Sequence, residues 1–451
     1  MPVNPADSPV FGTLYGTDAM RAVFDDEAFF RRMLDVEAAL ARVQGRLGLI
    51  PAEAAAAISD AAGAAVLDTA ELAASVRRVG YPVVAVVAAL TRAAGPEAGR
   101  WTHWGATTQD IMDTAQALQI RAALALVRAD LLATIRALAA LARAHRDTVM
   151  AGRTHLQHAL PVTFGLKCAT WLAPLVAHVH RLDQLRPRVE VAQFGGAAGT
   201  LASLGTDGIA VADALAAELG LAAPALPWHV CRDGVAEAVG LLGLICGSLA
   251  KIATDVILLA QTEVAEAAEP HEAGRGGSST MPQKRNPISS EYILAAGRAV
   301  QAMVPVMQGA MAADHERATG PWQAELLVLP QAFVLAHGAL AQARGLAEGM
   351  TIDTARMRRN LGATSGLIMA EAVMMGLAPV LGRGEAHHVV RHACDAAMAE
   401  GIGLAEALAR EPTVAAQLDT AAIARLTAPE NYLGSTQAFI DRALASAAAL
   451  D

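Results

Sequence analysis

The amino-acid sequence predicts an all-α protein built around long helices, and three observations support that fold class. Of the 451 residues, 54% are hydrophobic but only 4% are aromatic, and alanine, leucine and valine supply most of the apolar side chains. Alanine and leucine have favourable helix propensities. Apolar residues also recur every three or four positions over long, proline-free stretches, which is the period of an amphipathic helix. Helices this long need partners along their whole length, so we expect a helical bundle.

Two of the expected helices follow directly from this periodicity. The first carries one apolar stripe, formed by Leu124, Val127, Leu131, Ile135, Leu138 and Ala142. The second runs without proline from Asp233 to about Ala268. It would be about 50 Å long at the rise of 1.5 Å per residue of an α-helix.

Glycine- and proline-bearing stretches separate the helical segments. They lie at residues 95–105, 195–199, 222–234, 270–287 and 362–366. We predict three helical domains from these breaks. They are an N-terminal helical domain over residues 1–112, a central long-helix bundle over residues 113–358 with a mobile loop at 270–287, and a C-terminal helical domain over residues 359–451.

Charge and hydropathy argue against several classes of partner. The 44 acidic and 35 basic residues give a net charge of -9 without any long run of Lys or Arg, so we expect no nucleic acid and no anionic membrane surface. The apolar window from Ala238 to Ala250 is closed by Lys251 and is shorter than the roughly 20 residues that a bilayer requires. Residues 1–10 lack the charged and apolar regions of a secretory signal. A soluble, cytoplasmic protein is expected.

Patterns for metals, nucleotides and covalent nucleophiles are missing from the sequence. The four cysteines are far apart, form no C-x-x-C pair and lie in Ala/Leu-rich settings, which predicts buried, inert thiols. His388 and His392 are four residues apart without a third ligand pattern, so we expect a surface helix face rather than a metal site. Ser278 lies in no G-x-S-x-G or S-x-x-K motif. The sequence therefore predicts no cofactor and no metal.

Three polar segments stand out from the apolar helical background. They are Trp101 to Asp110, Gly152 to His158 and Gly274 to Pro287. Each also has a structural interpretation: the first can cap a helix, the second can hold structural histidines, and the third can be a solvated connector. Only three of the 35 basic residues are lysines, and Lys284 in the third segment is one of them.

The side chains of these segments suit acid/base chemistry on a small anionic substrate. Arg, Lys, Asn and Thr can hold carboxylates, while a serine hydroxyl and an imidazole can move protons. An unperturbed serine is too weak a base, so this chemistry requires a site that stabilises its alkoxide.

The third segment also resembles the signature of a known superfamily. Residues 277–287 read Gly-Ser-Ser-Thr-Met-Pro-Gln-Lys-Arg-Asn-Pro, similar to the G-S-S-x-M-P-x-K-x-N-P signature of the fumarase/aspartase superfamily. The other two segments resemble its T-S-x-D and T-H-x-Q regions. Within the superfamily, residues 101–113, 152–165, 314–322 and 365–372 most resemble the bacterial 3-carboxy-cis,cis-muconate cycloisomerases.

This resemblance implies a three-domain, all-helical homotetramer that shares its sites between subunits and needs no cofactor. It implies a reaction in which a carboxylate oxygen adds across a double bond and a lactone closes, in the protocatechuate branch of the β-ketoadipate pathway. Carried over by position, the proton-transferring residue is Ser278, and His155 is a possible acid. The expected substrate-binding residues are Thr107, Thr108, Gln109, Thr154, Gln157, Ser279, Met281, Lys284, Asn286 and Arg317.

Two positions depart from the family pattern. Thr108 replaces the more usual serine, and Gly234 stands where related chains tend to carry a further arginine. A carbon-nitrogen lyase acting on a substituted succinate therefore stays open as an alternative. A catalytically silent structural relative is a third interpretation, which is disfavoured by the presence of Ser278, Lys284, Asn286 and His155. The proton-transferring residue could also be Ser279 rather than Ser278.

Overall fold

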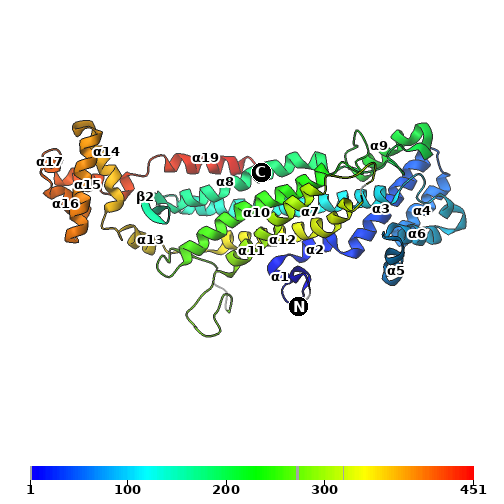
Figure 1. The fold of residues 1–451 in the computed structure, drawn as a ribbon, viewed down its shortest axis with the longest axis horizontal. Coiled ribbons are helices and arrows are strands. Elements are labelled where there is room, and N and C mark those ends of the chain that lie inside the picture. The colour runs from blue at the N-terminus through cyan, green and yellow to red at the C-terminus, as the bar shows by residue number, and fades with distance from the viewer. Residues whose placement is uncertain (1–2, 271–273, 318, 451) are drawn as a thin grey trace. The chain divides into compact units, whose positions relative to one another are not determined.

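The computed structural model of the chain describes residues 3–270, 274–317 and 319–450. They form helices joined by loops, together with two small two-stranded sheets (Figure 1). The predicted all-α fold class is confirmed.

The N-terminal elements are η1 (Pro5–Asp7), α1 (Gly12–Tyr15), α2 (Asp18–Phe24), α3 (Asp26–Arg46), α4 (Ala52–Ala64), α5 (Thr69–Val79), α6 (Val83–Ala98) and η2 (Gly99–Trp101). The middle of the chain forms α7 (Thr108–Ala144), β1 (Val149–Thr154), β2 (Gln157–Thr163), α8 (Phe164–Val189), η3 (Ala202–Asp207), α9 (Gly208–Leu219), α10 (Asp233–Ala260), β3 (Ala267–Ala268), α11 (Ile288–Gly309), α12 (Pro321–Gly349) and β4 (Thr351–Ile352). The C-terminal elements are α13 (Thr354–Leu361), η4 (Leu367–Met369), α14 (Ala370–Leu381), α15 (Arg383–Glu400), α16 (Leu404–Arg410), α17 (Pro412–Ala415), α18 (Thr420–Leu426), η5 (Pro429–Asn431) and α19 (Thr436–Ala448).

The chain divides into two compact units. Unit 1 comprises Met1–Asp130, His178–Leu249 and Tyr292–Ala341, and unit 2 comprises Leu131–Ala177, Ala250–Glu291 and Gln342–Asp451. The long helices α7, α8, α10 and α12 each contribute residues to both units. The division into three domains at residues 112 and 358 remains a prediction.

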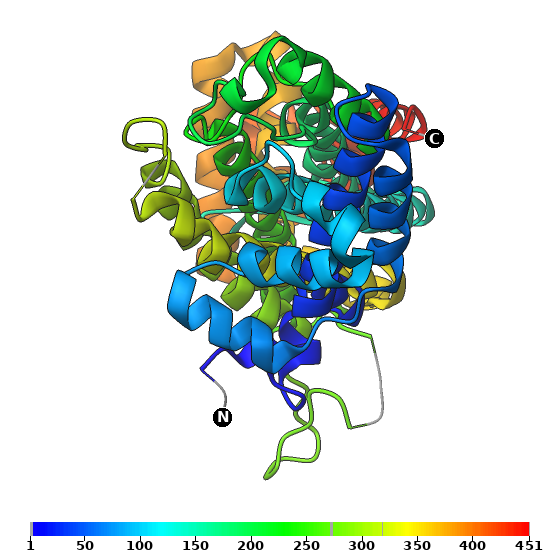
Figure 2. The same cartoon turned by 90° about the vertical axis from the view of Figure 1, so that its right-hand side faces the viewer.

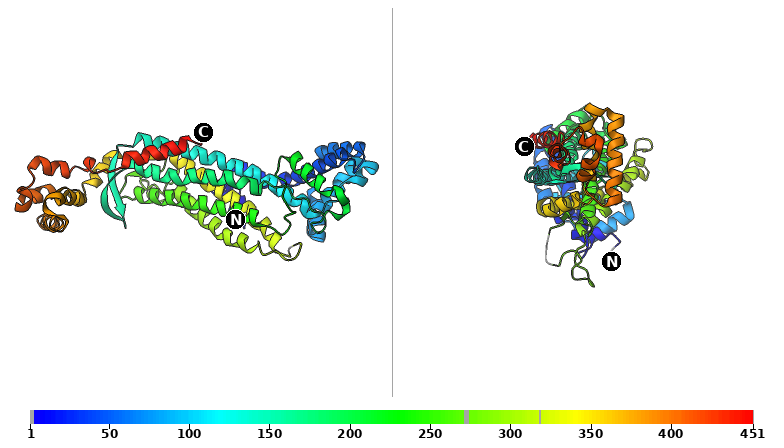
Figure 3. Two further views of the ribbon diagram at one scale, coloured as in Figure 1. Left: turned by 90° about the horizontal axis from the view of Figure 1, so that it is seen from above. Right: turned by 90° about the vertical axis from the view of Figure 1, so that its left-hand side faces the viewer.

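Each unit has its own apolar core. In unit 1, α3, α4 and α6 pack side by side (Figure 2, blue) around fully buried side chains such as Val36, Ile58 and Val86. In unit 2, α14, α15 and α16 pack together (Figure 3, orange) around Leu377 and Leu404. Burial of such aliphatic side chains is the main stabilising term in each core.

The predicted helices agree with the structure except at one end. All six residues of the apolar stripe in α7 are at most 2% exposed. Helix α10 begins at Asp233 as predicted but ends at Ala260 instead of about Ala268. The chain turns there, with Ala265 at a φ of 49°, so that Ala267 can pair with Ile352 in the β3–β4 sheet. The periodicity could not show this because the residues after Ala260 are also mostly compatible with a helix.

The two most apolar long helices also meet the length and hydropathy criteria for crossing a membrane. Eighteen-residue windows in α10 and α12 have mean hydropathies of 1.8 and 1.5, and 56% and 67% of these windows are buried inside the structure. Buried core helices of a helical bundle meet the same criteria of length and hydropathy.

The expectation of four buried thiols is wrong for one cysteine. Cys168 and Cys246 are buried, and desolvation by burial raises the pKa of both, to about 12 for Cys246. Cys394 is half-buried, but Cys231 is exposed in the loop before α10. His388 and His392 are exposed on α15, as predicted, and Nδ1 of His392 lies 2.8 Å from a carboxylate oxygen of Glu411.

Candidate active site

The first polar segment leads into α7 and is fixed by a buried carboxylate. Thr108 is the first residue of the helix, and Asp110 Oδ2 accepts a hydrogen bond of 3.0 Å from the backbone N–H of Thr107. A side chain in the first turn that binds the preceding N–H is one half of a capping box. The capping interpretation is therefore correct for Asp110, whereas the Thr107 hydroxyl is engaged elsewhere.

Asp110 also holds the glycine-rich loop that follows α8. Its fully buried carboxylate accepts hydrogen bonds of 2.9 Å from the N–H groups of both Gly195 and Gly196, and it lies 2.8 Å from Nε2 of His229. Five polar contacts to one carboxylate satisfy it without a buried cation. The loop is thereby held against the start of α7.

This arrangement brings two of the predicted binding residues together. The carbonyl of Ala197 accepts a hydrogen bond of 2.9 Å from the guanidinium of Arg317, and the hydroxyl of Thr107 accepts another of 3.2 Å from the same group. Both side chains are half-buried. A hydroxyl and a guanidinium held next to each other suit the recognition of a carboxylate.

Gln109 is fully buried, and its amide nitrogen has no capacity left for a substrate. Its Nε2 donates to Asp113 Oδ2 at 3.0 Å and to the His229 carbonyl at 2.9 Å. Because both partners are hydrogen-bond acceptors, the NH₂ group of the Gln109 amide must face them, and this determines the orientation of the amide. Gln109 Oε1 has no partner among the residues that the structure describes.

A buried ionic cluster lies one turn further along α7. Arg232, 1% exposed, donates to Asp113 at 2.7 Å and to Glu325 at 2.7 Å. Asp113 also accepts from Trp322 Nε1, and Glu325 accepts from Gln116. Burial raises the pKa of Glu325 despite the opposing effect of Arg232. The cluster joins α7 and α12 through Arg232, the residue that precedes α10, and no pattern in the sequence predicted it.

The second polar segment forms the tip of a β-hairpin. Thr154 ends β1 and Gln157 begins β2, and these two residues are paired. His155 and Leu156 form the two-residue turn with φ values of 51° and 63°, as in a type I′ turn. Thr154, His155 and Gln157 are all exposed. The sequence did not predict these strands.

An ion pair inside unit 2 supports the hairpin. Glu266 is fully buried and accepts hydrogen bonds of 2.7 and 2.9 Å from the guanidinium of Arg153 and one of 2.8 Å from Asn360. This bidentate pair fixes the residue that precedes Thr154. Burial and then the charge of Arg153 lower the pKa of the imidazole of the neighbouring His158.

The third polar segment is a loop whose base is closed by backbone hydrogen bonds. The carbonyl of Gly276 accepts from the N–H of Asn286 at 2.8 Å, and Gly277 forms a β-bridge with Arg285. Within the loop, the Met281 carbonyl accepts from the N–H of Lys284 at 3.0 Å. These bonds fix the backbone on which the predicted catalytic and binding side chains are mounted.

Ser278 differs from its neighbour Ser279 in its hydrogen bonding. Its Oγ accepts from the backbone N–H of Met281 at 3.1 Å and from that of Thr280 at 3.3 Å, whereas no hydrogen bond of the Ser279 hydroxyl occurs within the described part of the chain. Donors directed at an oxygen stabilise its anionic form. Ser278 is half-buried and Ser279 is exposed, so of the two hydroxyls only that of Ser278 has backbone donors directed at its oxygen in the described structure.

A cavity of about 340 Å³ lies at the base of the loop. It is lined by basic and amide side chains, among them Arg275, Lys284, Arg285 and Asn286. The lining carboxylate, Glu269, is already bound by the N–H groups of Ser289 and Ser290 at the start of α11 and by the Ser290 hydroxyl. The cavity is therefore electropositive and suits a carboxylate.

The distribution of lysines also singles out Lys284. Lys251 lies 2.6 Å and Lys167 3.9 Å from the carboxylate of Asp255, which also accepts from Trp171 Nε1. Burial lowers the pKa of Lys167. Lys284 is exposed, and its ammonium makes no hydrogen bond or ion pair with residues that the structure describes. Two lysines thus have structural partners, and the third is available to a ligand.

The predicted site residues fall into two groups. Thr107, Thr108, Gln109 and Arg317 belong to unit 1, whereas Thr154, His155, Gln157, Ser278, Ser279, Met281, Lys284 and Asn286 belong to unit 2. Within unit 2, no hydrogen bond joins the hairpin tip to the loop in the described ranges. No group of three or more metal-ligating side chains occurs in the described structure, which leaves out 271–273 and 318.

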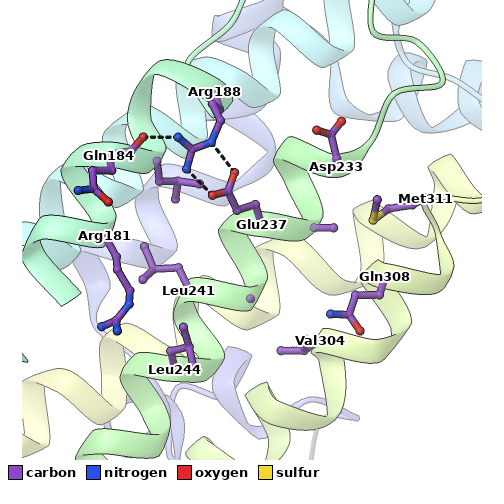
Figure 4. A pocket seen from close by; sticks show the side chains of 13 residues that line it. Arg181, Gln184, Arg188, Asp233, Glu237, Leu241, Leu244, Val304, Gln308 and Met311 are labelled. Carbon is purple, nitrogen blue, oxygen red and sulfur yellow. Dashed lines mark hydrogen bonds and ion pairs between the residues drawn. The ribbon is translucent and has the colours of Figure 1, made fainter. Parts of the chain in front are cut away.

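A second cavity, of about 540 Å³, lies between α8, α10 and α11 in unit 1. Arg188 pairs there with Glu237 and donates to the Gln184 carbonyl (Figure 4), while Leu241 and Leu244 supply an apolar floor. None of the predicted site residues lines this cavity.

Comparison with known proteins establishes the class of the chain. Residues 14–302 match the family described as Lyase, and residues 366–443 match the family described as Adenylosuccinate lyase C-terminus. The chain therefore belongs to the lyase family of the fumarase/aspartase superfamily.

Several individual relatives are similar over the whole chain. The chain is 49% identical to a 3-carboxy-cis,cis-muconate cycloisomerase of Pseudomonas aeruginosa, over 98% of this chain and 97% of that one. It is 42% identical to a nitrosuccinate lyase of Streptomyces davaonensis, over 97% and 94%. The crystal structure of the 3-carboxy-cis,cis-muconate lactonizing enzyme from Pseudomonas putida superimposes with a TM-score of 0.94 at 45% identity, over 98% and 99% of the two chains.

Proposed function

We propose that this protein is a cycloisomerase that lactonises 3-carboxy-cis,cis-muconate to 4-carboxymuconolactone. The observation that carries the chemistry is the pair of backbone N–H groups directed at Ser278 Oγ. The choice of substrate is supported by similarity over the full chain to cycloisomerases from several bacteria.

In the lactone-forming direction, one substrate carboxylate attacks the double bond and the carbon next to another carboxylate is protonated. Ser278 donates that proton, and the N–H groups of Thr280 and Met281 stabilise the alkoxide that remains. In the reverse direction the same alkoxide removes the proton. No cofactor takes part in this mechanism.

The other predicted residues bind and orient the polycarboxylate. Lys284 and Asn286 hold one carboxylate at the electropositive cavity, and Thr107, Thr108 and Arg317 hold another. Gln109 positions the start of α7 through Asp113 and the His229 carbonyl. At the hairpin tip His155 acts as an acid or a binding residue, flanked by Thr154 and Gln157. Ser279 and Met281 are the remaining substrate-binding residues of the loop in this proposal.

Replacement of the two loop serines tests the catalytic assignment. Ser278→Ala should lower kcat by at least about a hundredfold while substrate binding is retained, because its hydroxyl acts in the proton transfer. Ser279→Ala is the matched control and should retain most of the activity. Loss of the diene absorbance of 3-carboxy-cis,cis-muconate measures both, and a Ser278→Ala variant with a near-normal kcat would exclude this role.

The similarity to a nitrosuccinate lyase supports a second candidate function. A carbon-nitrogen lyase uses the same proton removal next to a carboxylate and then expels a nitrogen leaving group. Incubation with nitrosuccinate, followed by measurement of fumarate, separates the two functions. Fumarate formation without turnover of the muconate would favour the lyase.

We also propose that four copies of the chain assemble and share their sites, in the cytoplasm and within the protocatechuate branch of the β-ketoadipate pathway. Large apolar side chains remain exposed on the long helices of unit 1, among them Leu244, Val306 and Leu327 at 54%, 48% and 68%. Association of helices would cover them.

Mixed oligomers test whether sites are shared. The variants His155→Asn and Ser278→Ala should each be inactive alone. When they are dissociated and reassembled together in equal amounts, about a quarter of the active sites should contain both intact residues and be active. Mixed oligomers that are verified by mass and stay inactive would contradict the sharing of His155 and Ser278 between subunits.

A further inference from the structure

A buried histidine behind the first polar segment has no role in the proposed mechanism. His229 is 2% exposed and lies in the loop before α10, and its Nε2 is 2.8 Å from Oδ1 of Asp110. The carboxylate of Asp110 also accepts hydrogen bonds from the N–H groups of Thr107, Gly195 and Gly196. The imidazole therefore contacts the group that joins the Thr107 turn to the glycine-rich loop.

The structure fixes both the tautomer and the position of this imidazole. A carboxylate only accepts hydrogen bonds, so Nε2 of His229 carries a proton and donates it to Asp110. The backbone carbonyl of His229 accepts at 2.9 Å from the amide of Gln109. A Cβ added to Gly195 would lie 2.9 Å from Cε1 of the ring. The ring thus packs directly against the glycine-rich loop.

The same two segments hold the guanidinium of Arg317. Its Nη1 donates to the Thr107 hydroxyl at 3.2 Å, and its Nη2 donates to the carbonyls of Ala197 at 2.9 Å and Gly196 at 3.4 Å. A guanidinium has five N–H groups. The Nε–H and one N–H of Nη1 remain, and neither has a partner among the residues that the structure describes. These two groups are available to a ligand.

Asp110 determines where this guanidinium points. It binds the N–H of Thr107, whose hydroxyl accepts from Arg317, and the N–H of Gly196, whose carbonyl accepts from the same group. Among the five contacts of the Asp110 carboxylate, the one with His229 is the shortest. Hydrogen bonds to an ionised group are the stronger ones. Without the imidazole, the carboxylate and the two segments bound to it would be free to shift.

Stability alone does not require a polar side chain at this position. An apolar side chain of similar volume would fill the same space without the cost of burying an imidazole. What His229 adds is a directional hydrogen bond to the carboxylate. A displacement of about 1 Å in a group that orients a substrate is enough to impair its function.

We propose that His229 is a positioning residue of the Arg317 subsite: through Asp110 it directs the two available N–H groups of Arg317 toward one carboxylate of the substrate. This inference rests on the proposed function and extends it, because it makes the orientation of one substrate-binding group depend on a residue that does not touch the substrate.

Two amide substitutions at His229 separate its hydrogen bond from its volume. The amide nitrogen of glutamine takes about the place of the imidazole Nε2 and can donate to Asp110, whereas that of asparagine is one methylene too short. Calorimetry measures the affinity of the full-length protein for propane-1,2,3-tricarboxylate. His229→Asn should bind it about tenfold more weakly than the wild-type protein, and His229→Gln within about threefold of the wild-type affinity.

The buried His178 supplies the matched control. Its Nε2 lies 2.8 Å from the Ser248 hydroxyl, so His178→Asn also removes a contact of a buried imidazole in unit 1, but not one to Asp110. This variant should bind the tricarboxylate as the wild-type protein does. A purely structural role of His229 would lower the melting temperature of His229→Asn without changing its affinity.

Three outcomes would overturn the inference. They are wild-type affinity in His229→Asn, an equal loss of affinity in His229→Asn and His229→Gln, and the absence of tricarboxylate binding by the wild-type protein. If His229→Asn fails to fold, His229→Gln decides: affinity within about threefold of the wild type supports the inference, and a tenfold loss contradicts it.

A double substitution tests whether the effect passes through Arg317. Arg317→Lys keeps the charge but loses the forked contacts to Thr107 and the loop carbonyls. In this background His229→Asn should weaken binding by about twofold or less, because both changes act on one group. The full tenfold loss in this background would show that His229 does not act through Arg317.

Kinetics separate this inference from the proposed function. With the muconate as substrate, His229→Asn should raise KM about tenfold and leave kcat within about threefold, because Arg317 binds a carboxylate and transfers no proton. A fall in kcat at unchanged KM would contradict the inference and leave the proposed function standing. If the wild-type protein does not turn the muconate over, the proposed function fails, and the tricarboxylate affinities still decide the inference.

Discussion

The base of the loop that carries Ser278 should not tolerate a side chain at Gly276. This glycine has a φ of 68°, and a Cβ added to it would lie 2.6 Å from the carbonyl oxygen of Asn286. Gly274, two residues earlier, also has a positive φ, of 81°, but a Cβ there would meet nothing within 4 Å. The two alanine variants share the strain of a positive φ, and only Gly276→Ala adds a backbone collision.

The structure sets the size of the expected displacement. Ordinary contact begins near 3.4 Å, so the two strands at the loop base must separate by about 0.8 Å, enough to break the 2.8 Å hydrogen bond from Asn286 to Gly276. Displacements of this size in an active site can lower the rate by about a hundredfold. We expect kcat/KM to fall by about 30- to 100-fold in Gly276→Ala and by about threefold or less in Gly274→Ala.

The diene absorbance assay measures both variants, and circular dichroism with thermal unfolding checks that each is folded. The positive φ costs each variant about 1 to 2 kcal/mol, and only Gly276→Ala adds the collision with Asn286, so its melting temperature should be the lower of the two. Equal activity of the two variants would refute the reasoning, since it would mean that the loop base does not position Ser278, Lys284 or Asn286 for catalysis.

Three other predictions concern the ammonium group of Lys284, the buried ionic cluster around Arg232 and stability at acidic pH. Lys284→Arg should weaken binding of a dicarboxylate inhibitor although it keeps the charge, because a planar guanidinium does not replace a compact ammonium; unchanged affinity would contradict this. Arg232→Met should lower the free energy of unfolding by about 3 to 5 kcal/mol, because Asp113 and Glu325 remain buried without their cation, whereas the exposed Arg298→Met should change it by less than about 0.5 kcal/mol in denaturant titrations. Burial and then Arg181 lower the pKa of His178 to about 4, so its contribution to stability is complete above pH 6.5 and is lost as the pH falls toward 4; urea unfolding of His178→Asn should show a smaller loss over that interval, and an identical loss would show that other groups dominate.

The all-α fold and the three polar segments could be predicted because their signals are local. The helix period of α7 and the motif around Ser278 are contained within short stretches of sequence. The same local signals misplaced the end of α10, where pairing of Ala267 with Ile352 takes over from helix propensity. The hairpin at His155 was missed because its turn uses no glycine or asparagine, the usual signal of a two-residue hairpin.

The sequence by itself determined the superfamily, the helical architecture and the residues that carry charge and hydroxyl groups. Only the tertiary structure decided which of them are partners, because those contacts join positions far apart in the chain. Glu37 reaches His103 across 66 residues, and Asp110 reaches His229 across 119. Burial gives each pair its strength and has no signature in a single sequence, since it depends on which helices pack over the pair.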